Sequence, residues 1–236
     1  MAKNEQLRAN LLRSISHDLR TPLTSISGNA GILISNADNM GKEKQQQLYE
    51  DIYEDSLWLI NLVENLLSVT RIEDGTMKLQ FNAELLEEIV QEAVHHVEKR
   101  CKKHKLRVKL SDDLILVKAD ARLIVQVLVN LVDNAVKYTP NGSEILIETK
   151  QEGKNAVVSV SDNGKGISDE AKEHIFEMFY TDSSHVADSR RSLGLGLALC
   201  KSILHVHGGN IFVEDCQPHG ARFTFTLPAK EVQLHE

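Results

Sequence analysis

The sequence predicts an α+β protein, in which a helical hairpin forms a dimeric four-helix bundle and an α/β sandwich domain follows it. Three observations support this fold class. The 236 residues suffice for one or two domains, and a hydrophobic content of 42% supports a real core. Apolar residues recur at helical spacing in the first part of the chain. From about Leu79 onward, helical and strand periodicities alternate.

The first predicted helix runs from Glu5 to about Asn36. Its apolar residues fall seven apart, as in a coiled-coil seam: Leu12, Leu19, Ile26 and Leu33, with Ile15 and Leu23 in the intermediate turns. Pro22 removes a backbone donor and crowds the preceding turn, so we expect a bend near Leu19. His17 and Thr21 lie four residues apart on the outward face of this helix.

A second helix follows the turn-forming residues 36–41. Its apolar positions show the same spacing: Ile52, Leu59 and Leu66, with Leu48, Leu62 and Val69 between them. It should end at Glu73-Asp74-Gly75, because glycine readily adopts a left-handed conformation. Two helices cannot bury such long apolar stripes alone, so we expect a second copy to complete the bundle as a homodimer.

The rest of the chain predicts further helices and strands in alternation. We expect helices at 84–103, 121–138 and 196–207, and strands at 105–110, 144–151, 156–161, 210–215 and 221–227. The simplest packing has the helices on one face of a mixed sheet. The basic run 99–109 is interpreted as solvated surface, because cations suit a helix C-terminus.

Composition argues against several function classes. The net charge of -7 is unsuited to a nucleic-acid-binding surface, and no polybasic segment suggests a membrane contact. Cys101, Cys200 and Cys216 show no C-x-x-C spacing, so we expect a reducing compartment and neither a zinc site nor a disulfide framework. No apolar run approaches the ~18 residues of a membrane span, so we expect a cytosolic chain.

The helix at 121–138 is the most informative segment. Asp120 is its expected N-cap, and Pro140 follows its end. Its few polar positions recur at helical spacing: Gln126, Asn130, Asn134 and Lys137. Such a stripe on a mostly buried helix indicates a wet site, where an asparagine carbonyl binds Mg²⁺ and a lysine meets a phosphate. The alternative is a stripe that satisfies other buried polar groups.

Two glycine-containing segments add weaker signals. An apolar strand ends at Asp162 and opens into Gly164 and Gly166, where a carboxylate accepts a hydrogen bond from an amine such as that of adenine. Gly194 and Gly196 precede a helix, whose free N–H groups favour phosphate, although a plain turn has the same pattern. The P-loop, Rossmann and protein-kinase signatures are absent from the sequence.

Five segments together resemble the H, N, G1, F and G2 boxes of sensor histidine kinases, in the same order and spacing. They are SHDLRTPLT (16–24), NLVDNAVKYTP (130–140), DNGKGI (162–167), FEMFY (176–180) and GLGLAL (194–199). The likeness covers nearly the whole chain. SRRSLGLGLALCKSI and GARFTFTLP are most similar to the potassium-sensing Kdp-type sensor kinases.

The resemblance implies a dimerisation and histidine phosphoacceptor domain at 1–75. It implies a catalytic ATP-binding domain at 79–229, of the superfamily shared with gyrase and heat-shock chaperones. His17 corresponds to the phosphoacceptor, and Asp18 to the acid that takes the proton from the ring nitrogen that does not attack. Thr21 corresponds to the residue that orients water to hydrolyse the phosphoaspartate of the regulator.

The resemblance also implies that ATP and Mg²⁺ bind the second domain. Asn134 corresponds to the magnesium ligand, Asn130 and Lys137 flank the phosphates, and Asp162 recognises adenine. The other implied contacts shape the pocket and its lid: Tyr138, Gly164, Gly166, Ile167, Phe179, Gly194, Leu195 and Gly196. Hydrolytic relatives usually carry glutamate at the position of Asn130, and an amide cannot deprotonate water, so transfer to histidine should exceed hydrolysis.

Two positions depart from the family pattern. Thr181 stands where an arginine commonly follows the F box, and Arg191-Ser192-Leu193 stand where additional glycine often precedes the G2 box. Arg190 or Arg191, within the polar lid, is expected to supply the missing phosphate contact.

The leading interpretation is the cytosolic core of an ATP-dependent autokinase that passes phosphate to the receiver domain of a response regulator. The resemblance further implies attachment to a membrane sensor in the full-length protein. The alternatives are a dimeric nucleotide-binding scaffold or pseudokinase, and a regulator phosphatase with little kinase activity.

Overall fold

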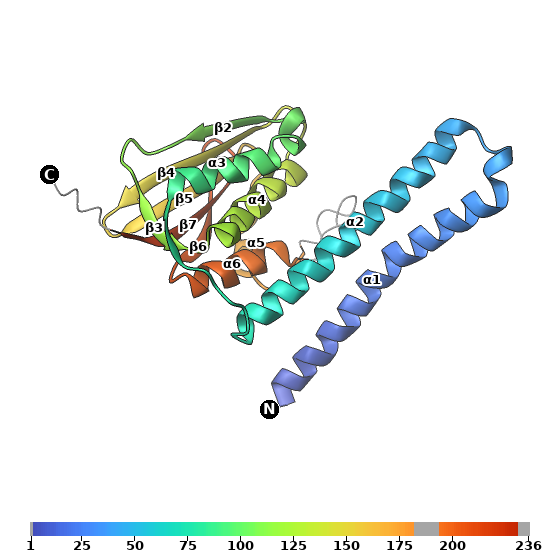
Figure 1. Cartoon of the computed structure of the whole chain (residues 1–236), viewed down its shortest axis with the longest axis horizontal. Coiled ribbons are helices and arrows are strands. Elements are labelled where there is room, and N and C mark those ends of the chain that lie inside the picture. Colours follow the sequence, from blue (N-terminus) through green and yellow to red (C-terminus); the bar gives the residue numbers. More distant parts are fainter. Residues whose placement is uncertain (1, 182–193, 231–236) are drawn as a thin grey trace. The chain divides into compact units, whose positions relative to one another are not determined.

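The computed structural model describes residues 2–181 and 194–230, with side chains described from Leu19 onward except at Ala37 (Figure 1). These residues form two compact units, of which the first takes the chain to Leu67 and the second begins at Ser68. The first unit is built from helices, and the second combines helices with a sheet. The predicted order, a helical region followed by a mixed α/β domain, is confirmed.

Two long helices make up the beginning of the chain. They are α1 (Ala2–Asn36) and α2 (Lys42–Glu73), joined by the 3-10 turn η1 (Ala37–Asn39). Both predicted helices and the turn between them are therefore confirmed. Helix α1 continues through Pro22 as one element, and the bend expected near Leu19 stays a prediction.

The end of α2 follows the predicted glycine chemistry. Gly75 has φ of 63°, and its N–H donates to the carbonyl of Ile72 at 3.1 Å. The next N–H, of Thr76, donates to Arg71 at 3.0 Å. These bonds satisfy the last carbonyls of the helix.

Much apolar surface of the hairpin faces solvent. Leu33 and Leu62 are buried, yet other apolar side chains of the two helices are 43% exposed or more: Leu23, Ile32, Ile34, Tyr49, Tyr53, Ile60, Val63 and Leu67. A single copy of the chain thus leaves a large apolar area in water, which is unfavourable.

The second unit contains a seven-stranded mixed sheet. Its strands are β1 (Asn82–Leu85), β2 (Lys105–Lys109), β3 (Leu116–Ala119), β4 (Glu144–Glu152), β5 (Asn155–Asp162), β6 (Asn210–Asp215) and β7 (Ala221–Lys230). The order is β1-β3-β7-β5-β4-β2, and β6 also pairs with β7. Among the strand pairs of the described residues, β2–β4 alone is parallel.

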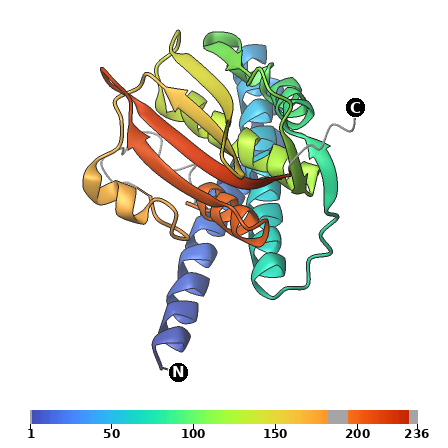
Figure 2. The same ribbon diagram turned by 90° about the vertical axis from the view of Figure 1, so that its left-hand side faces the viewer.

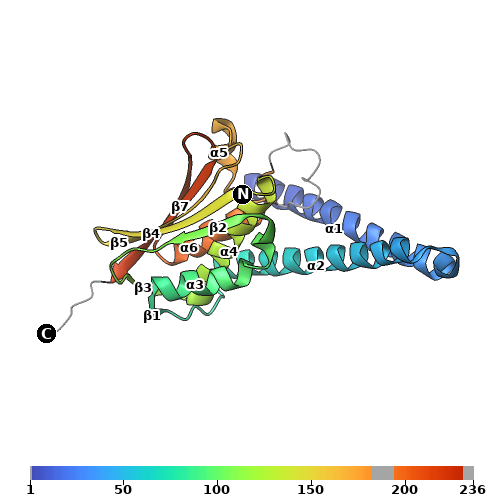
Figure 3. The same cartoon turned by 90° about the horizontal axis from the view of Figure 1, so that it is seen from above.

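Three helices cover one face of this sheet, as predicted (Figures 2 and 3). They are α3 (Leu86–Val97), α4 (Ala121–Tyr138) and α6 (Gly196–Val206). Alternate residues of β4, Ile145, Ile147 and Thr149, are buried, so one face of the strand meets the helices and the other meets water. This packing fixes α4 and the end of β5 against one core.

Several short elements differ from the sequence prediction. The predicted helix at 84–103 begins instead with β1 and ends with the 3-10 turn η2 (Arg100–Lys103). Strands β1 and β3 and the short helix α5 (Asp169–His174) were not predicted. Each has too few residues to show a periodicity, and β1 forms because its four residues pair with β3.

Asp120 stands at the N-cap of α4, but the prediction that its side chain caps the helix is wrong. Its Oδ2 instead accepts the N–H of Gln80 at 3.0 Å, and its two oxygens bind the guanidinium of Arg122. Burial opposes the charge of this carboxylate, but the bonds from Arg122 and Gln80 outweigh it and hold its pKa below the usual range. Asp120 thus anchors the segment between α2 and β1.

His207 is the buried partner of Asp120. Its Nε2 accepts the backbone N–H of Asp120 at 3.0 Å, so Nδ1 carries the hydrogen and donates to the carbonyl of Ile203 at 2.7 Å. Burial lowers the pKa of His207, against the carbonyl of Ile203 and the charge of Asp120, which raise it. The neutral ring fits this site, and a proton on Nε2 would face another N–H.

We therefore expect the protein to lose stability as pH falls through the range in which unfolded His207 takes up a proton. Because the folded pKa is depressed, the unfolded state binds more protons there, and the stability is restored as pH rises above the unfolded pKa of ~6.5. The measurement is the melting temperature of wild type and His207→Gln at pH 5.5 and 7.5. The melting temperature of wild type should exceed that of His207→Gln by less at the lower pH. Each kcal/mol of stability lost lowers the melting temperature by about 2–4 °C. An advantage that is equal at both pH values would contradict this.

Candidate functional site

The polar stripe of α4 is present and only partly covered. Gln126, Asn130, Asn134 and Lys137 are of intermediate exposure, whereas five of the positions between them are buried: Val127, Leu128, Leu131, Val132 and Ala135. Within the described residues, the buried Nδ2 of Asn130 has no hydrogen-bond partner. A buried amide without a partner is costly, so a polar group or a water molecule at this position would be favourable.

Helix α6 packs on the same part of α4. The Sγ of Cys200 lies 3.8 Å from the carbonyl oxygen of Val127. Burial raises the pKa of Cys200 to about 12, against the side chain of Asn130, which lowers it. Cys200 is therefore a neutral core thiol, and its contact places α6 against the helix that carries the stripe.

The first turn of α6 has features that suit an anion. Leu195, at the N-cap, gives no side-chain hydrogen bond, and no described atom would lie within 4 Å of a Cβ on Gly196. Leu195 itself is buried and anchors the turn. The N–H groups at such a terminus and the helix dipole both favour a phosphate.

Asp162 ends β5 with one carboxylate oxygen held in place. Its Oδ1 accepts the N–H of Gly164 at 2.8 Å and that of Ala221 at 3.4 Å. Among the described residues no hydrogen bond ends on Oδ2. Burial raises the pKa of this carboxyl, and the two N–H groups oppose the shift. The arrangement presents one fixed acceptor to a donor such as an exocyclic amine.

The loop after Asp162 requires glycine at two positions. A Cβ on Gly164 would lie 2.8 Å from Cγ2 of Thr139 and 2.9 Å from Oδ1 of Asp162. Gly166 has φ of 79°. Since Thr139 directly follows α4, the Asp162 loop and the end of the polar stripe meet. Tyr138 is 39% exposed at this junction, with Lys137 Nζ 5.2 Å from its ring centroid.

Phe179 and Gly194 meet although fourteen residues separate them in sequence. The N–H of Phe179 donates to the carbonyl of Gly194 at 3.2 Å. Both have positive φ, 65° and 61°, and a Cβ on Gly194 would lie 2.3 Å from the carbonyl oxygen of Tyr180. Ile167 is half-buried against the core of the same unit. Arg190 and Arg191 lie outside the described residues.

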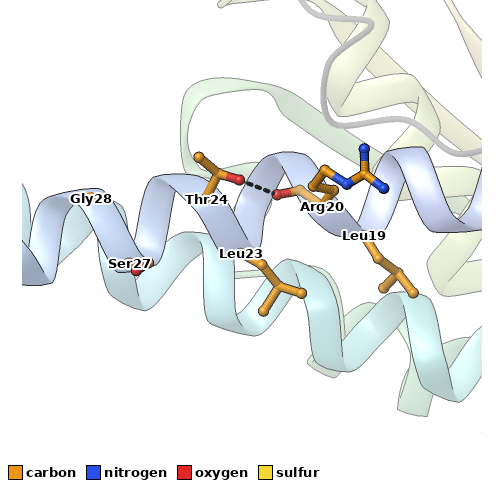
Figure 4. A pocket seen from close by; sticks show the side chains of 6 residues that line it. All are labelled: Leu19, Arg20, Leu23, Thr24, Ser27 and Gly28. Carbon is orange, nitrogen blue, oxygen red and sulfur yellow. Dashed lines mark hydrogen bonds between the residues drawn. The ribbon is translucent and has the colours of Figure 1, made fainter.

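The predicted phosphoacceptor segment lies on α1. The helix includes His17 and Asp18, whose side chains lie outside the described part of the chain, and Thr21 is exposed. A hollow of about 700 Å³ follows on the same helix, lined by Leu19, Arg20, Leu23, Thr24, Ser27 and Gly28 (Figure 4). The hydroxyl of Thr24 donates to the carbonyl of Arg20 at 2.8 Å.

Two other kinds of site are absent from the described residues. No group of three or more His, Cys, Asp or Glu side chains in ranges 2–181 and 194–230 is arranged to hold a metal ion. No helix of these ranges is long and apolar enough to cross a membrane. The polar groups around α4 and Asp162 are therefore the strongest candidate site.

The contacts of Thr139, Ala221 and His219 with the Asp162 loop were not predicted. His219 places its Nδ1 3.0 Å from the carbonyl oxygen of Gly164. Thr139 lies far from Asp162 in sequence, and Ala221 and His219 lie outside the recognised boxes. The pairing of β5 with β7 brings Ala221 and His219 beside Asp162.

Comparison with known families matches both parts of the chain. Residues 7–75 match the His Kinase A (phospho-acceptor) domain. Residues 119–231 match the histidine kinase-, DNA gyrase B- and HSP90-like ATPase family.

Curated relatives include two sensor proteins KdpD. That of Clostridium acetobutylicum is 46% identical over 226 residues, and that of Escherichia coli is 37% identical over 227 residues. Each alignment covers 96% of this chain and 25% of the relative. The chain thus spans about a quarter of the length of these relatives.

Solved structures agree with these matches. The catalytic domain of the histidine kinase ThkA is 31% identical, with a TM-score of 0.57 over 63% of this chain and 95% of that chain. A complex of the same kinase with the response regulator protein TrrA gives a TM-score of 0.72 at 26% identity, over 97% of this chain and 64% of that chain.

Proposed function

The chain belongs to the sensor histidine kinases, with greatest likeness to KdpD sensor proteins among the relatives above, and we propose that it is the catalytic core of such a kinase. It uses ATP to phosphorylate His17 and then passes the phosphoryl group to an aspartate of a response regulator. The observation that carries the nucleotide part of this proposal is Asp162, whose Oδ1 is fixed by two N–H groups while Oδ2 remains for the amine of adenine.

The residues around Asp162 suit the rest of the nucleotide. Asn130 offers a buried amide that lacks a partner in the described structure, and the first turn of α6 offers N–H groups to phosphate. Asn134 and Lys137 lie on the same stripe, as a magnesium ligand and a phosphate contact. Bound Mg²⁺ would neutralise charge on the phosphates, and Arg190 or Arg191 supplies a further cation. Tyr138 packs beside the site.

His17 is the nucleophile of the reaction. One imidazole nitrogen forms a bond to the γ-phosphorus, the bond from this phosphorus to the bridging oxygen breaks, and ADP leaves with the electron pair. Asp18 takes the proton from the other ring nitrogen and so keeps the attacking nitrogen nucleophilic. Asn130 carries an amide, which cannot act as the general base for water, so transfer exceeds hydrolysis.

Residues 1–75 form the dimerisation and phosphoacceptor domain, and residues 79–229 form the catalytic domain. The exposed apolar side chains of α1 and α2 support a homodimer, because a four-helix bundle would remove them from water. The full-length protein attaches this core to a membrane sensor, and the core itself works in the cytoplasm.

Incubation with γ-labelled ATP tests the proposal. We expect label on the protein that is labile in acid and stable in alkali, as a phosphohistidine is, and transfer of that label to a response regulator. Binding of ATP without incorporation of label would favour the alternative, a dimeric nucleotide-binding scaffold or pseudokinase.

A second expectation concerns Thr21→Ala, which should separate kinase from phosphatase activity. Thr21 is exposed four residues after His17, and its hydroxyl can orient a water in line with a phosphoaspartate. Autophosphorylation does not need this water, so its rate should stay within a few-fold. Release of phosphate from the phosphorylated regulator should fall at least ~10-fold, about 1.4 kcal/mol of transition-state stabilisation.

The neighbouring Thr24 gives a matched control, because it carries the same side chain about one turn further along α1 from His17. Thr24→Ala should change regulator dephosphorylation little. Unaffected dephosphorylation in Thr21→Ala, with collapsed autophosphorylation, would mean that Thr21 belongs to the kinase geometry instead.

A further inference from the structure

The turn between β6 and β7, residues 216–220, packs against the loop that carries Asp162. The two strands form an antiparallel hairpin, drawn in red in Figure 2. The N–H of Cys216 donates to the carbonyl of Gly220 at 3.0 Å, which closes the turn. A Cβ on Gly220 would lie 1.9 Å from the carbonyl oxygen of Asp162, so the two backbones touch. The turn is therefore the immediate support of the Asp162 loop.

His219 makes the side-chain contact between this turn and the loop. Its Nδ1 lies 3.0 Å from the carbonyl oxygen of Gly164, and because a carbonyl only accepts, Nδ1 is the donor. On the other side of the same residue, the N–H of Gly164 donates to Oδ1 of Asp162 at 2.8 Å. Gly164 is thus held at both of its backbone polar groups.

These two bonds form a short chain that ends on the carboxylate. His219 fixes the carbonyl of Gly164, Gly164 fixes Oδ1, and the orientation of Oδ2 follows because the carboxylate is planar. Gly164 lacks a side chain that could anchor it and would clash with Thr139 if it had one. The hydrogen bonds of Gly164 therefore hold the loop together with its backbone contact with Gly220.

We propose that His219 is a positioning residue for nucleotide selection, which acts through Gly164 to aim Oδ2 of Asp162 at the amine of the base. The inference rests on the proposed role of Asp162. A fixed acceptor binds a purine with a 6-amino group more tightly than one with a 6-oxo group, because in the second case two acceptors would face each other. A loosely held carboxylate rotates away and discriminates less.

The test measures the Kd of ATP and of inosine triphosphate for the whole chain, each with Mg²⁺. In His219→Leu the donor is lost, and we expect the preference for ATP over inosine triphosphate to fall about 3- to 10-fold, the value of one net hydrogen bond. His219→Asn is smaller, but its Nδ2 is attached to Cγ as Nδ1 of histidine is and can replace the donor, so it should keep the preference within about 2-fold. His205→Ala is the control, because His205 is an exposed histidine of α6 in the same unit.

Each result has a distinct meaning. Equal weakening of both nucleotides in His219→Leu would assign His219 a purely structural role and overturn the inference, as would equal loss of preference in His219→Asn and His219→Leu. If wild type does not prefer ATP over inosine triphosphate, the proposed role of Asp162 fails first. A preference in wild type that persists in His219→Leu overturns the role of His219 alone.

Discussion

Replacing His17 with glutamine is expected to abolish autophosphorylation while the Kd of ATP changes no more than a few-fold. The amide of glutamine has no nucleophilic lone pair on nitrogen, so no bond to phosphorus can form. The proposed nucleotide contacts of the described residues, from Asn130 onward, lie in the second unit, whereas His17 belongs to the first. The substitution therefore removes the acceptor and leaves the nucleotide site.

The measurement is the initial rate of label incorporation from γ-labelled ATP, together with ATP binding to the same preparation. The rate should fall at least about 1,000-fold, which corresponds to ~4 kcal/mol in the activation barrier. His95→Ala, at an exposed histidine of α3, should label as wild type does. If acid-labile, alkali-stable label persisted in His17→Gln, the acceptor would be another histidine.

The long elements were predictable because each contains enough residues to show its period. Helix α4 occupies the predicted residues 121–138, and its polar stripe was recognised from spacing alone. Strand β6 likewise occupies the predicted range 210–215. The elements that were missed, such as β1 and β3, have four residues each and owe their structure to pairing with strands distant in sequence.

Local rules also failed where tertiary contacts compete for a side chain. Asp120 has the position of an N-cap, yet its carboxylate binds Gln80 and Arg122 instead. The N-cap propensity of aspartate reflects hydrogen bonds to nearby backbone groups. It carries no information about the N–H of Gln80, forty residues away in sequence. The departure has a structural use, because the bond to Gln80 ties the preceding segment to the domain.

In the candidate site, too, some features were predictable from local sequence and others depend on tertiary contacts. The identity of Asp162, Gly164 and Gly166 was visible as a motif, since the chemistry of the loop needs those residue types at those spacings. Its support was not visible, because Ala221 and His219 reach the loop only through the register of β5 with β7. A sequence motif thus identifies the groups proposed to contact a ligand, whereas the residues that support those groups are identified from the sheet topology.

Asn134→Ala is expected to remove the magnesium-dependent part of nucleotide binding. Asn134 lies on the polar stripe of α4, one turn from Asn130, and its carbonyl oxygen is a suitable ligand for Mg²⁺. Without that oxygen the Kd of Mg-ATP should rise at least about 100-fold, or ~2.7 kcal/mol. The Kd of ATP in excess chelator should change less than about 3-fold, because the contacts of the base with Asp162 are untouched.

Two further measurements make this expectation specific to the metal. The mass of the particle in solution should stay that of the proposed dimer, since the proposed dimerisation surface lies within residues 1–75. Asn155→Ala, at an exposed asparagine that begins β5, should bind Mg-ATP as wild type does. If Asn134 had only a structural role in the stripe, its replacement would change the Kd of ATP equally with and without Mg²⁺. Equal losses in both conditions, or an unchanged affinity for Mg-ATP, would therefore remove Asn134 from the magnesium site and leave the metal to be held by other groups of the pocket.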